Sequence, residues 1–384
     1  MSRKLSPVPQ KSLPVIPNAG RRAELLTEQL ERRLPVRPGD GRLPPDWLDP
    51  ADLRRQVALP KLVVSDSYNS SWGFLPLRES IASTLGERGI QCGAEQISTT
   101  YGGNNGLDLI IRCYVRPGDV VLVDEPGYYP LFWKLAVAGA NIVGVKRLHQ
   151  GPDLDDLELK ARELKPRLFF TQSLAHNPMG GSITSGVAYG ILKVAEANGL
   201  LVVEDDPFAD LLPSAAPRLA ALDQLNRVIY VGSFSKTLPG SFRVGFVAAS
   251  PAIASEINEM KVITMISTSA QNERLVHALI QDARYLKYLR RLSERLSEAT
   301  SITVKALETR GFAVQRPTGG GFYVWVDLPP KMRRATLAAE AAAKGIFIAT
   351  SEVFMVKHDA VTGMRINVAH GADTRFLQWL GEWR

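Results

Sequence analysis

One lysine-containing segment combines residue types that suit carbonyl chemistry beside a bound phosphate. Lys236 follows Ser233 and Ser235, and Arg243 comes seven residues after the lysine. The segment begins directly after the apolar run 228–232, which predicts a buried strand. A lysine at the mouth of a sheet is partly desolvated, so its pKa falls and its amine can attack a carbonyl carbon. Two hydroxyls and a guanidinium suit a phosphate dianion. The alternative is an exposed loop lysine with an arginine near it by coincidence.

A glycine-rich turn is a second candidate for binding the same anion. Gly102, Gly103 and Asn104 lie between a predicted strand at 96–100 and a predicted helix at 106–115. Glycines allow backbone N–H groups to approach an anion, and the N-terminus of the helix adds its dipole. Taken alone, the motif is equally compatible with a simple turn.

Three further motifs each follow a predicted strand. Tyr128 could stack on a flat cofactor or pack in the core. Asn177 could donate to a phenolic oxygen or form an Asx turn before the next proline. Asp206 could pair with a protonated ring nitrogen, or the acidic pair that it forms with Asp205 could cap a helix. The separate alternatives do not explain why all of these motifs lie at strand ends.

The motifs depend on a regular alternation of strands and helices. Short β-branched runs alternate with amphipathic stretches, which is typical of an α/β domain with a mostly parallel sheet that is buried on both faces. Ligands bind at the carboxyl ends of the strands in such sheets. The predicted strands are 96–100, 120–124, 141–145, 167–171, 200–204, 228–232 and 244–248, and the helices between them include 106–115, 131–138, 153–164 and 185–198.

The flanking regions differ from this pattern. Prolines interrupt the first fifty residues, which predict an extended arm with one helix at 21–34. After residue 251, long charged helices and strands at 321–328 and 363–368 indicate a smaller α+β domain. We therefore divide the chain into an N-terminal arm (1–50), a large domain (51–255) and a small C-terminal domain (256–384).

The composition limits location and partners. The 46 basic and 39 acidic residues give a net charge of +7, but the basic residues are scattered, so we expect no nucleic-acid partner. The two cysteines form no CxxC motif and predict reduced thiols. No apolar run approaches the ~18 residues that cross a bilayer, and the N-terminus lacks the pattern of a signal peptide. We expect a cytoplasmic protein with no membrane partner and no metal site.

At three places the sequence resembles fold-type I enzymes that depend on pyridoxal 5′-phosphate (PLP), in the class I/II aminotransferase group: GDVVLVDEPGYYPLF, RLFFTQSLAHNPMG and RVIYVGSFSKTLPGSFRVGF. More narrowly, the chain is similar to the aminotransferase-like domain of MocR-type proteins from about Gly41 to the C-terminus. The resemblance implies a large domain with a mostly parallel seven-stranded sheet and a smaller α+β domain. It also implies a homodimer with shared active sites.

The resemblance assigns roles to individual residues. Lys236 would hold PLP as a Schiff base and later carry the proton of the substrate Cα, and Asp206 would keep the pyridine nitrogen protonated. Tyr128 would stack on the ring, and Asn177 would hydrogen-bond its O3′ oxygen. Arg365 would fork onto the substrate α-carboxylate, which indicates an α-amino acid. The phosphate would be bound by Gly102, Gly103, Asn104, Ser233, Ser235 and Arg243, with Tyr68 reaching across from the other subunit.

The sequence departs from the family pattern at three places. Ala209 stands three residues after Asp206, where the family has a tyrosine that donates to O3′, and the preceding Phe208 also lacks a hydroxyl. Met179 replaces the usual threonine after Asn-Pro and places an apolar side chain near the site. MocR-type proteins carry an N-terminal winged helix, which the proline-rich start of this chain does not fit, so we expect the catalytic module alone.

These features predict a PLP-dependent transferase of amino-acid metabolism, an aminotransferase that converts an α-amino acid into a 2-oxo acid. The missing tyrosine leaves another PLP reaction open. It could be elimination or replacement at the β- or γ-carbon, decarboxylation, oxidative deamination or C–C bond formation in specialised metabolism. A further alternative is a PLP-sensing regulatory module, which would bind DNA or associate with a DNA-binding chain.

Overall fold

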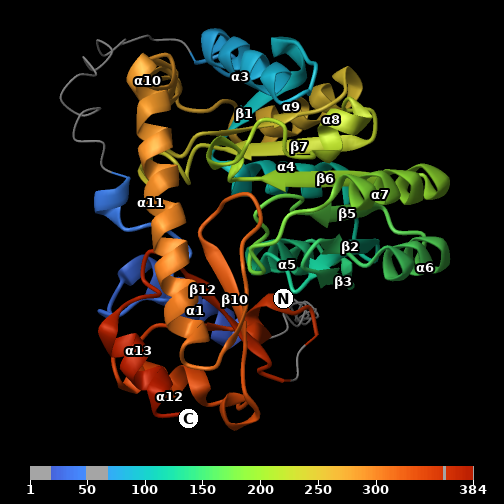
Figure 1. Cartoon of the computed structure of the whole chain (residues 1–384). Helices are drawn as coiled ribbons and strands as arrows, with labels where there is room; N and C mark the ends of the chain where they lie inside the picture. The colour runs from blue at the N-terminus through green and yellow to red at the C-terminus, as the bar shows by residue number, and fades with distance from the viewer. Residues whose placement is uncertain (1–18, 49–67, 358–359, 384) are drawn as a thin grey trace, which may run out of the picture.

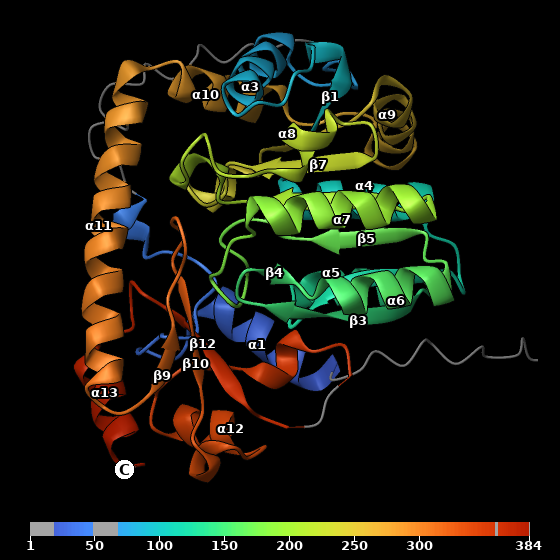
Figure 2. The ribbon, with the colours of Figure 1, turned by 45° about the vertical axis from the view of Figure 1, so that its right-hand side comes forward.

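The structure is a computed structural model that describes residues 19–48, 68–357 and 360–383 (Figure 1). It contains a large and a small β-sheet, and the long helix α11 (Ala283–Glu308) runs beside both. In Figures 1 and 2, α11 extends from α10 (Ala270–Ile280) and α3 (Leu75–Glu87) at one end to α13 (Thr374–Gly381) at the other. The long charged helices that the sequence predicted after residue 251 are therefore present.

The large sheet has the strand order β1-β8-β7-β6-β5-β2-β3-β4. Neighbours from β7 through β3 pair in parallel, and β8 pairs antiparallel with both β1 and β7. The seven predicted strands are all present, and the two-residue β4, which was not predicted, adds to the end of β3. The strands are β1 (Ile97–Thr100), β2 (Val120–Glu125), β3 (Asn141–Leu148), β4 (Gly151–Pro152), β5 (Leu168–Thr171), β6 (Leu201–Asp206), β7 (Val228–Ser233) and β8 (Gly245–Ala248).

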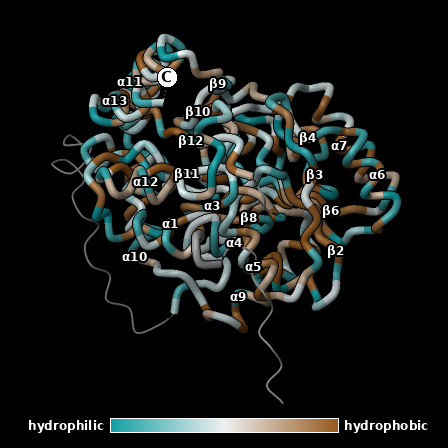
Figure 3. Tube along the Cα trace, turned by 90° about the horizontal axis from the view of Figure 1, so that it is seen from below, coloured by the Kyte–Doolittle hydropathy of each residue, from teal (hydrophilic) through white to brown (hydrophobic). Residues whose placement is uncertain are grey.

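Both faces of the large sheet are buried, which explains why its strands are apolar throughout. Successive side chains point to opposite faces, so Val121 and Val123 join one hydrophobic core while Leu122 joins another. In β6, Val202 and Val203 divide in the same way. Figure 3 shows hydrophobic residues gathered along β2, β3 and β6.

Helices cover the two faces separately. The face of Val123 packs on α4 (Gly103–Tyr114), α5 (Tyr129–Val137) and α9 (Pro251–Met265). The face of Leu122 packs on α6 (Leu154–Leu164), α7 (Ser185–Asn198) and α8 (Leu219–Asp223). Local signals fix the ends of α7, because the Thr184 hydroxyl accepts from Val187 N at 3.3 Å and Gly199 ends the helix in the left-handed conformation.

The small sheet is antiparallel, with the order β11-β12-β10-β9. Its strands are β9 (Ala313–Gln315), β10 (Tyr323–Asp327), β11 (Ala349–Thr350) and β12 (Gly363–Asn367), and α12 (Leu337–Ala343) follows β10 in the chain. Short 3-10 helices are η1 (Pro45–Trp47), η2 (Ala94–Gln96), η3 (Ala209–Leu211), η4 (Gly240–Phe242), η5 (Pro330–Met332) and η6 (Ser351–Phe354).

The N-terminal arm docks on the small sheet. It contains α1 (Ala19–Glu31), which lies beside β12 in Figures 1 and 2. After α1, Phe347 N donates to Val36 O at 2.7 Å, and Asn367 N donates to Pro38 O at 2.7 Å. These bonds carry the next residues of the arm to the carboxyl ends of the large-sheet strands.

Candidate functional site

A pocket of about 340 Å³ lies at the carboxyl ends of the central large-sheet strands, and we call it the Lys236 pocket. Its lining comes from the arm, the start of α4, the loops after β2, β5, β6 and β7, and the small sheet. Of the residues that the sequence singled out, it brings together Lys236, Gly103, Asn104, Tyr128, Asn177, Ser233, Ser235, Arg243 and Arg365. Asp206, Gly102 and Tyr68 are not part of the lining.

Lys236 is held in surroundings that favour its neutral form. Its amine donates to the carbonyl oxygen of Gly41 at 3.0 Å. The rings of Phe208 and Phe322 lie 5.8 and 5.6 Å from the amine. Burial lowers the pKa of Lys236 to about 8, and the positive charge of Arg365 adds to that effect. Near pH 8 a large share of this amine is unprotonated and nucleophilic.

Hydrogen-bond donors gather at the N-terminus of α4. Gly102 caps the helix with φ +77, a conformation that glycine adopts without strain. The amides of Asn105 and Gly106 donate to the Gly102 carbonyl, while those of Gly103 and Asn104 have no acceptor among the residues that the structure describes. These two amides can therefore receive an anion.

Arg243 and two serines lie against this helix end. The Arg243 guanidinium donates to Tyr101 O at 2.7 Å, and a Cβ added to Gly102 would lie 3.0 Å from it. The hydroxyls of Ser233 and Ser235 are 2.9 Å apart. The close approach explains why residue 102 is a glycine although it does not line the pocket. A cation, two hydroxyls and a helix N-terminus together fit a phosphate dianion.

The position of Asp206 requires a correction. Its carboxylate is fully buried on the other face of the sheet, where it accepts from Arg218 Nε at 2.8 Å and from the Tyr230 hydroxyl at 2.9 Å. The reason is strand parity, because β6 continues to residue 206 and adjacent residues point to opposite faces. Asp205 is therefore the acid of this pair that lines the Lys236 pocket.

Asp205 has the environment of a ligand-binding acid. It accepts from Gln172 Nε2 at 2.6 Å, and burial raises its pKa to about 6. The residue three positions after Asp205 is Phe208, and the residue three positions after Asp206 is Ala209. Phe208 lines the pocket and Ala209 does not, so Phe208 is the residue without a hydroxyl that a ligand in this pocket would contact.

Arg365 lines the pocket with a buried guanidinium. It donates to Asn177 Oδ1 and to Gly39 O, both at 2.8 Å, and stacks on the ring of Tyr323 at 4.4 Å. It is only 1% exposed. Since Asn177 uses its oxygen for Arg365, its amide nitrogen remains a donor for a ligand.

Sequence reasoning missed a polar network around Gln172, which is itself part of the pocket lining. Gln172 follows β5, and its backbone N–H donates to Asp124 Oδ2 at 3.1 Å while its side-chain oxygen accepts from Asn177 N at 2.9 Å. Asp124 also pairs with the buried Arg147 at 3.0 Å. Gln172 thus fixes the positions of Asp205 and Asn177 at once. Its place after a buried strand was the one sequence signal for it.

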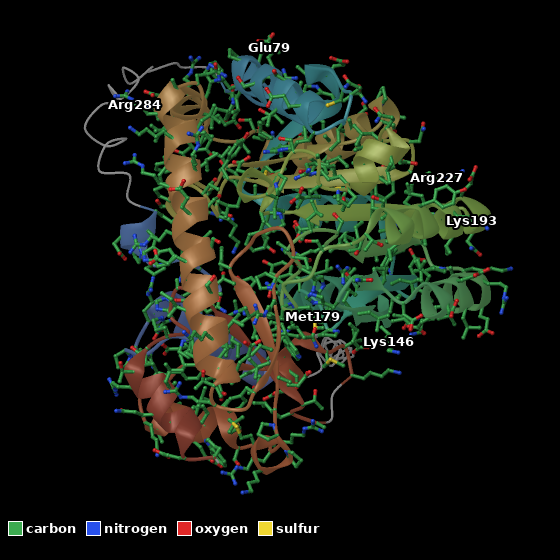
Figure 4. All side chains as sticks on the ribbon, in the orientation of Figure 1. Glu79, Lys146, Met179, Lys193, Arg227 and Arg284 are labelled. Carbon is green, nitrogen blue, oxygen red and sulfur yellow. The ribbon has the colours of Figure 1, made fainter. Side chains whose placement is uncertain are left out.

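Tyr68 and Met179, which the sequence also singled out, both lie outside the pocket lining. Tyr68 is 80% exposed and lies outside the pocket of its own chain. Met179 is buried in the same hydrophobic core as Trp325 and Phe354, and Figure 4 shows it between the large and the small sheet. Met179 therefore packs between the two sheets, and it does not line the pocket. By contrast, Lys193 and Arg227 lie at the periphery in Figure 4.

Within residues 19–48, 68–357 and 360–383, no helix has the length and apolar character needed to cross a membrane. In the same part of the chain, no group of three or more His, Cys, Asp or Glu side chains could hold a metal ion.

The chain matches a known protein family. The family model "Aminotransferase class I and II" matches residues 66–377. Aromatic-amino-acid aminotransferase 1 of Thermococcus litoralis is 29% identical over 314 residues, which cover 79% of this chain and 75% of that protein. The crystal structure of Pyrococcus horikoshii kynurenine aminotransferase in complex with PMP superposes with a TM-score of 0.85 at 26% identity and covers 97% of this chain and 96% of the other.

Regulators are also among the relatives. The HTH-type transcriptional regulator YdfD of Bacillus subtilis, whose function is uncharacterised, is 26% identical over 291 residues. The match covers 75% of this chain and 60% of that protein.

Proposed function

Because the chain belongs to the aminotransferase class I and II family and is a PLP-dependent transferase, we propose that it converts an α-amino acid into a 2-oxo acid by transferring the amino group to PLP. One observation carries this proposal. A single pocket combines a desolvated lysine, Lys236, with two arginines on separate elements, Arg243 beside α4 and Arg365 on β12. One arginine suits a phosphate and the other an α-carboxylate.

The residues present fit PLP. Bound PLP would supply an electrophilic aldehyde and a ring that accepts the electron pair left when the Cα–H bond breaks. Gly103, Asn104, Ser233, Ser235 and Arg243 would hold the phosphate, and Tyr128 would stack on the ring. Asp205 would hold the proton of the ring nitrogen, and the free amide of Asn177 would donate to the ring oxygen.

Lys236 would act twice. Its amine would hold PLP through the aldehyde, and the same amine would move the proton of the substrate Cα. Arg365 would fix the α-carboxylate, which sets the torsion that exposes the Cα–H bond to the ring. Leu26 and Tyr129 would help exclude water from one wall of the pocket.

The experiment is a half-reaction screen. The purified protein, loaded with PLP, is mixed with single amino acids, and PLP and pyridoxamine phosphate are separated by chromatography. The proposal expects pyridoxamine phosphate and the matching 2-oxo acid with at least one α-amino acid, and none with Lys236→Ala. Absence of pyridoxamine phosphate with a complete panel of amino acids contradicts it.

Phe208 favours a second candidate reaction. The side chain of Phe208 cannot donate a hydrogen bond to O3′ of PLP, so PLP bound here would keep a proton more readily. This property suits elimination or replacement at the β- or γ-carbon as well as transamination. Such a reaction would regenerate PLP as the aldehyde and release a leaving group. Turnover of O-acetylserine or a similar amino acid, with no pyridoxamine phosphate formed, would favour this candidate.

The likeness to YdfD favours a regulatory candidate. In that role, PLP binding would change association with DNA or with a DNA-binding chain rather than support turnover. A gel shift against DNA upstream of the encoding gene, with and without PLP, tests it, and the aminotransferase proposal expects no shift in either condition.

We also propose a cytoplasmic homodimer with shared sites. The exposed phenol of Tyr68 would reach the phosphate of the other subunit, and the two free, half-buried cysteines suit a reducing compartment. Mass measurement in solution tests the dimer.

We place the boundary between the large and small domains after α9 rather than at residue 255, because α9 spans that residue and packs on α4.

A further inference from the structure

The Lys236 pocket contains one more cation than the proposed reaction uses. Its basic lining residues are Lys236, Arg243, Arg365 and Arg42, and its acidic lining residue is Asp205. The first three cations are assigned to the aldehyde, the phosphate and the α-carboxylate. Arg42 is the basic residue of this lining to which no ligand group is assigned.

Arg42 is held close to the reacting groups by its backbone. It follows Gly41, whose carbonyl oxygen accepts from Lys236 Nζ at 3.0 Å and from the Tyr323 hydroxyl at 2.8 Å. Asn367 Nδ2 donates to Arg42 O at 2.8 Å and anchors it to β12, two residues beyond Arg365. The side chain of Arg42 therefore starts one peptide unit away from the carbonyl that binds the lysine.

The Arg42 guanidinium has no acidic partner in the described part of the chain, unlike Arg37 of the same arm. It is half-buried and donates to the carbonyl oxygen of Gln29 in α1. No carboxylate pairs with it within residues 23–48, 68–357 and 360–383. In the same arm, Arg37 bonds Glu28 and Asp40. A guanidinium that is partly desolvated and has no acid is a suitable partner for a ligand carboxylate.

The positive charge of Arg42 and the apolar residues of the pocket wall both suit an acidic substrate side chain. Like Arg365, Arg42 carries a positive charge that lowers the pKa of Lys236. Leu26 and Leu30 of α1 also line the pocket and offer apolar contacts for methylene groups. An acidic side chain with a short methylene linker would use both features.

We propose that Arg42 binds the side-chain carboxylate of the substrate, so that the preferred substrates are dicarboxylic amino acids. The inference rests on the proposed function, because it requires Arg365 to hold the α-carboxylate. Arg365 and Arg42 would then grip the two ends of one substrate, while its amine faces Lys236.

The test compares two substrate classes in three proteins. The half-reaction is measured with aspartate, glutamate and 2-aminoadipate, and with leucine and phenylalanine, in the wild type, Arg42→Gln and Arg33→Gln. Arg33 is a matched control, because it belongs to the same arm, is 70% exposed and does not line the pocket. Arg42→Gln should lower kcat/KM about 10- to 100-fold for dicarboxylic substrates alone, and Arg33→Gln should change neither class.

A binding measurement separates recognition from catalysis. Calorimetry with glutarate and butyrate, which cannot react, should show tighter binding of glutarate in the wild type, and Arg42→Gln should remove that preference. Arg42→Lys keeps the charge but loses the planar fork, so it should fold like the wild type and retain an intermediate preference.

The outcomes distinguish the two proposals. Wild-type preference for neutral amino acids, or an equal loss of both classes in Arg42→Gln, overturns the role of Arg42 and leaves the aminotransferase proposal standing. If no amino acid reacts, the aminotransferase proposal fails. Calorimetry then tests Arg42 alone, and equal binding of glutarate and butyrate overturns it.

Discussion

The carboxylates of Asp205 and Asp206 are adjacent in sequence and lie on opposite faces of the large sheet. Asp205 bonds Gln172 in the Lys236 pocket, and Asp206 bonds the buried Arg218 behind it. β6 continues through both residues, and successive side chains of a strand point to opposite faces. Asp205 therefore faces the ligand pocket, and Asp206 faces the core.

This separation predicts different phenotypes for two matched variants. Asp205→Asn should fold normally and lower kcat on the order of 100-fold, because the proton on the ring nitrogen loses its electrostatic partner. Asp206→Asn should lower the free energy of unfolding by about 3–5 kcal/mol, because it leaves the buried charge of Arg218 without a counter-ion. Thermal unfolding and half-reaction rates of both variants check this. Reversed phenotypes would restore Asp206 as the ring partner.

Replacing Phe208 by tyrosine should change how the absorbance of lysine-bound PLP depends on pH. Phe208→Tyr should place a hydroxyl near the ring oxygen, and a donor to that oxygen stabilises its anionic form. The pH midpoint of the absorbance change of lysine-bound PLP should therefore fall by about one unit. Phe208→Leu is the control, since it adds no donor. An unchanged midpoint in Phe208→Tyr would show that residue 208 does not reach the ring oxygen.

Arg365→Lys should weaken the substrate complex. Lysine keeps the charge but cannot contact Asn177, Gly39 and a carboxylate with one planar group. We expect kcat/KM to fall about 10- to 100-fold, mainly through KM, while PLP affinity stays unchanged. Arg316→Lys, at an exposed arginine outside the pocket, is the control. A loss confined to PLP affinity would contradict the role in substrate binding.

The lowered pKa of Lys236 predicts how PLP uptake depends on pH. The neutral amine is the nucleophile, and the protonated form predominates below the pKa. The rate of PLP association with the cofactor-free protein should therefore rise with pH, reach half its maximum at about 8 and level off above it. In Arg42→Gln the midpoint should shift upward, because one positive charge that opposes protonation is gone. Stopped-flow absorbance measures both, and a midpoint near 10 in the wild type would contradict the desolvated lysine.

The sequence predicted the large sheet well for a physical reason. Strands that are buried on both faces read as apolar runs, and the polar residues that end them mark the ligand side of the sheet. Lys236, Arg243, Tyr128 and Asn177 were identified in this way, and all of them line one pocket.

Other parts of the site could not be predicted because they depend on tertiary contacts. The choice between Asp205 and Asp206 follows from where β6 ends, and the predicted strand stopped at residue 204 instead of 206. Arg42 reaches the pocket because backbone hydrogen bonds join the arm to the small domain. The residue pattern of the arm does not predict these hydrogen bonds. Tyr323 enters the pocket from a strand that is distant in sequence.

Lys236, proposed to carry the cofactor, has a natural competitor for that role in a second buried lysine. Lys261 is also buried, its pKa is likewise lowered to about 8, and it donates to the Thr99 hydroxyl at 3.2 Å outside the pocket. The decisive measurement is borohydride reduction of the PLP-loaded protein followed by peptide mass mapping. We predict a phosphopyridoxyl group on Lys236, which is lost in Lys236→Ala and retained in Lys261→Ala. A label on Lys261, or an unchanged visible absorbance band in Lys236→Ala, would contradict it.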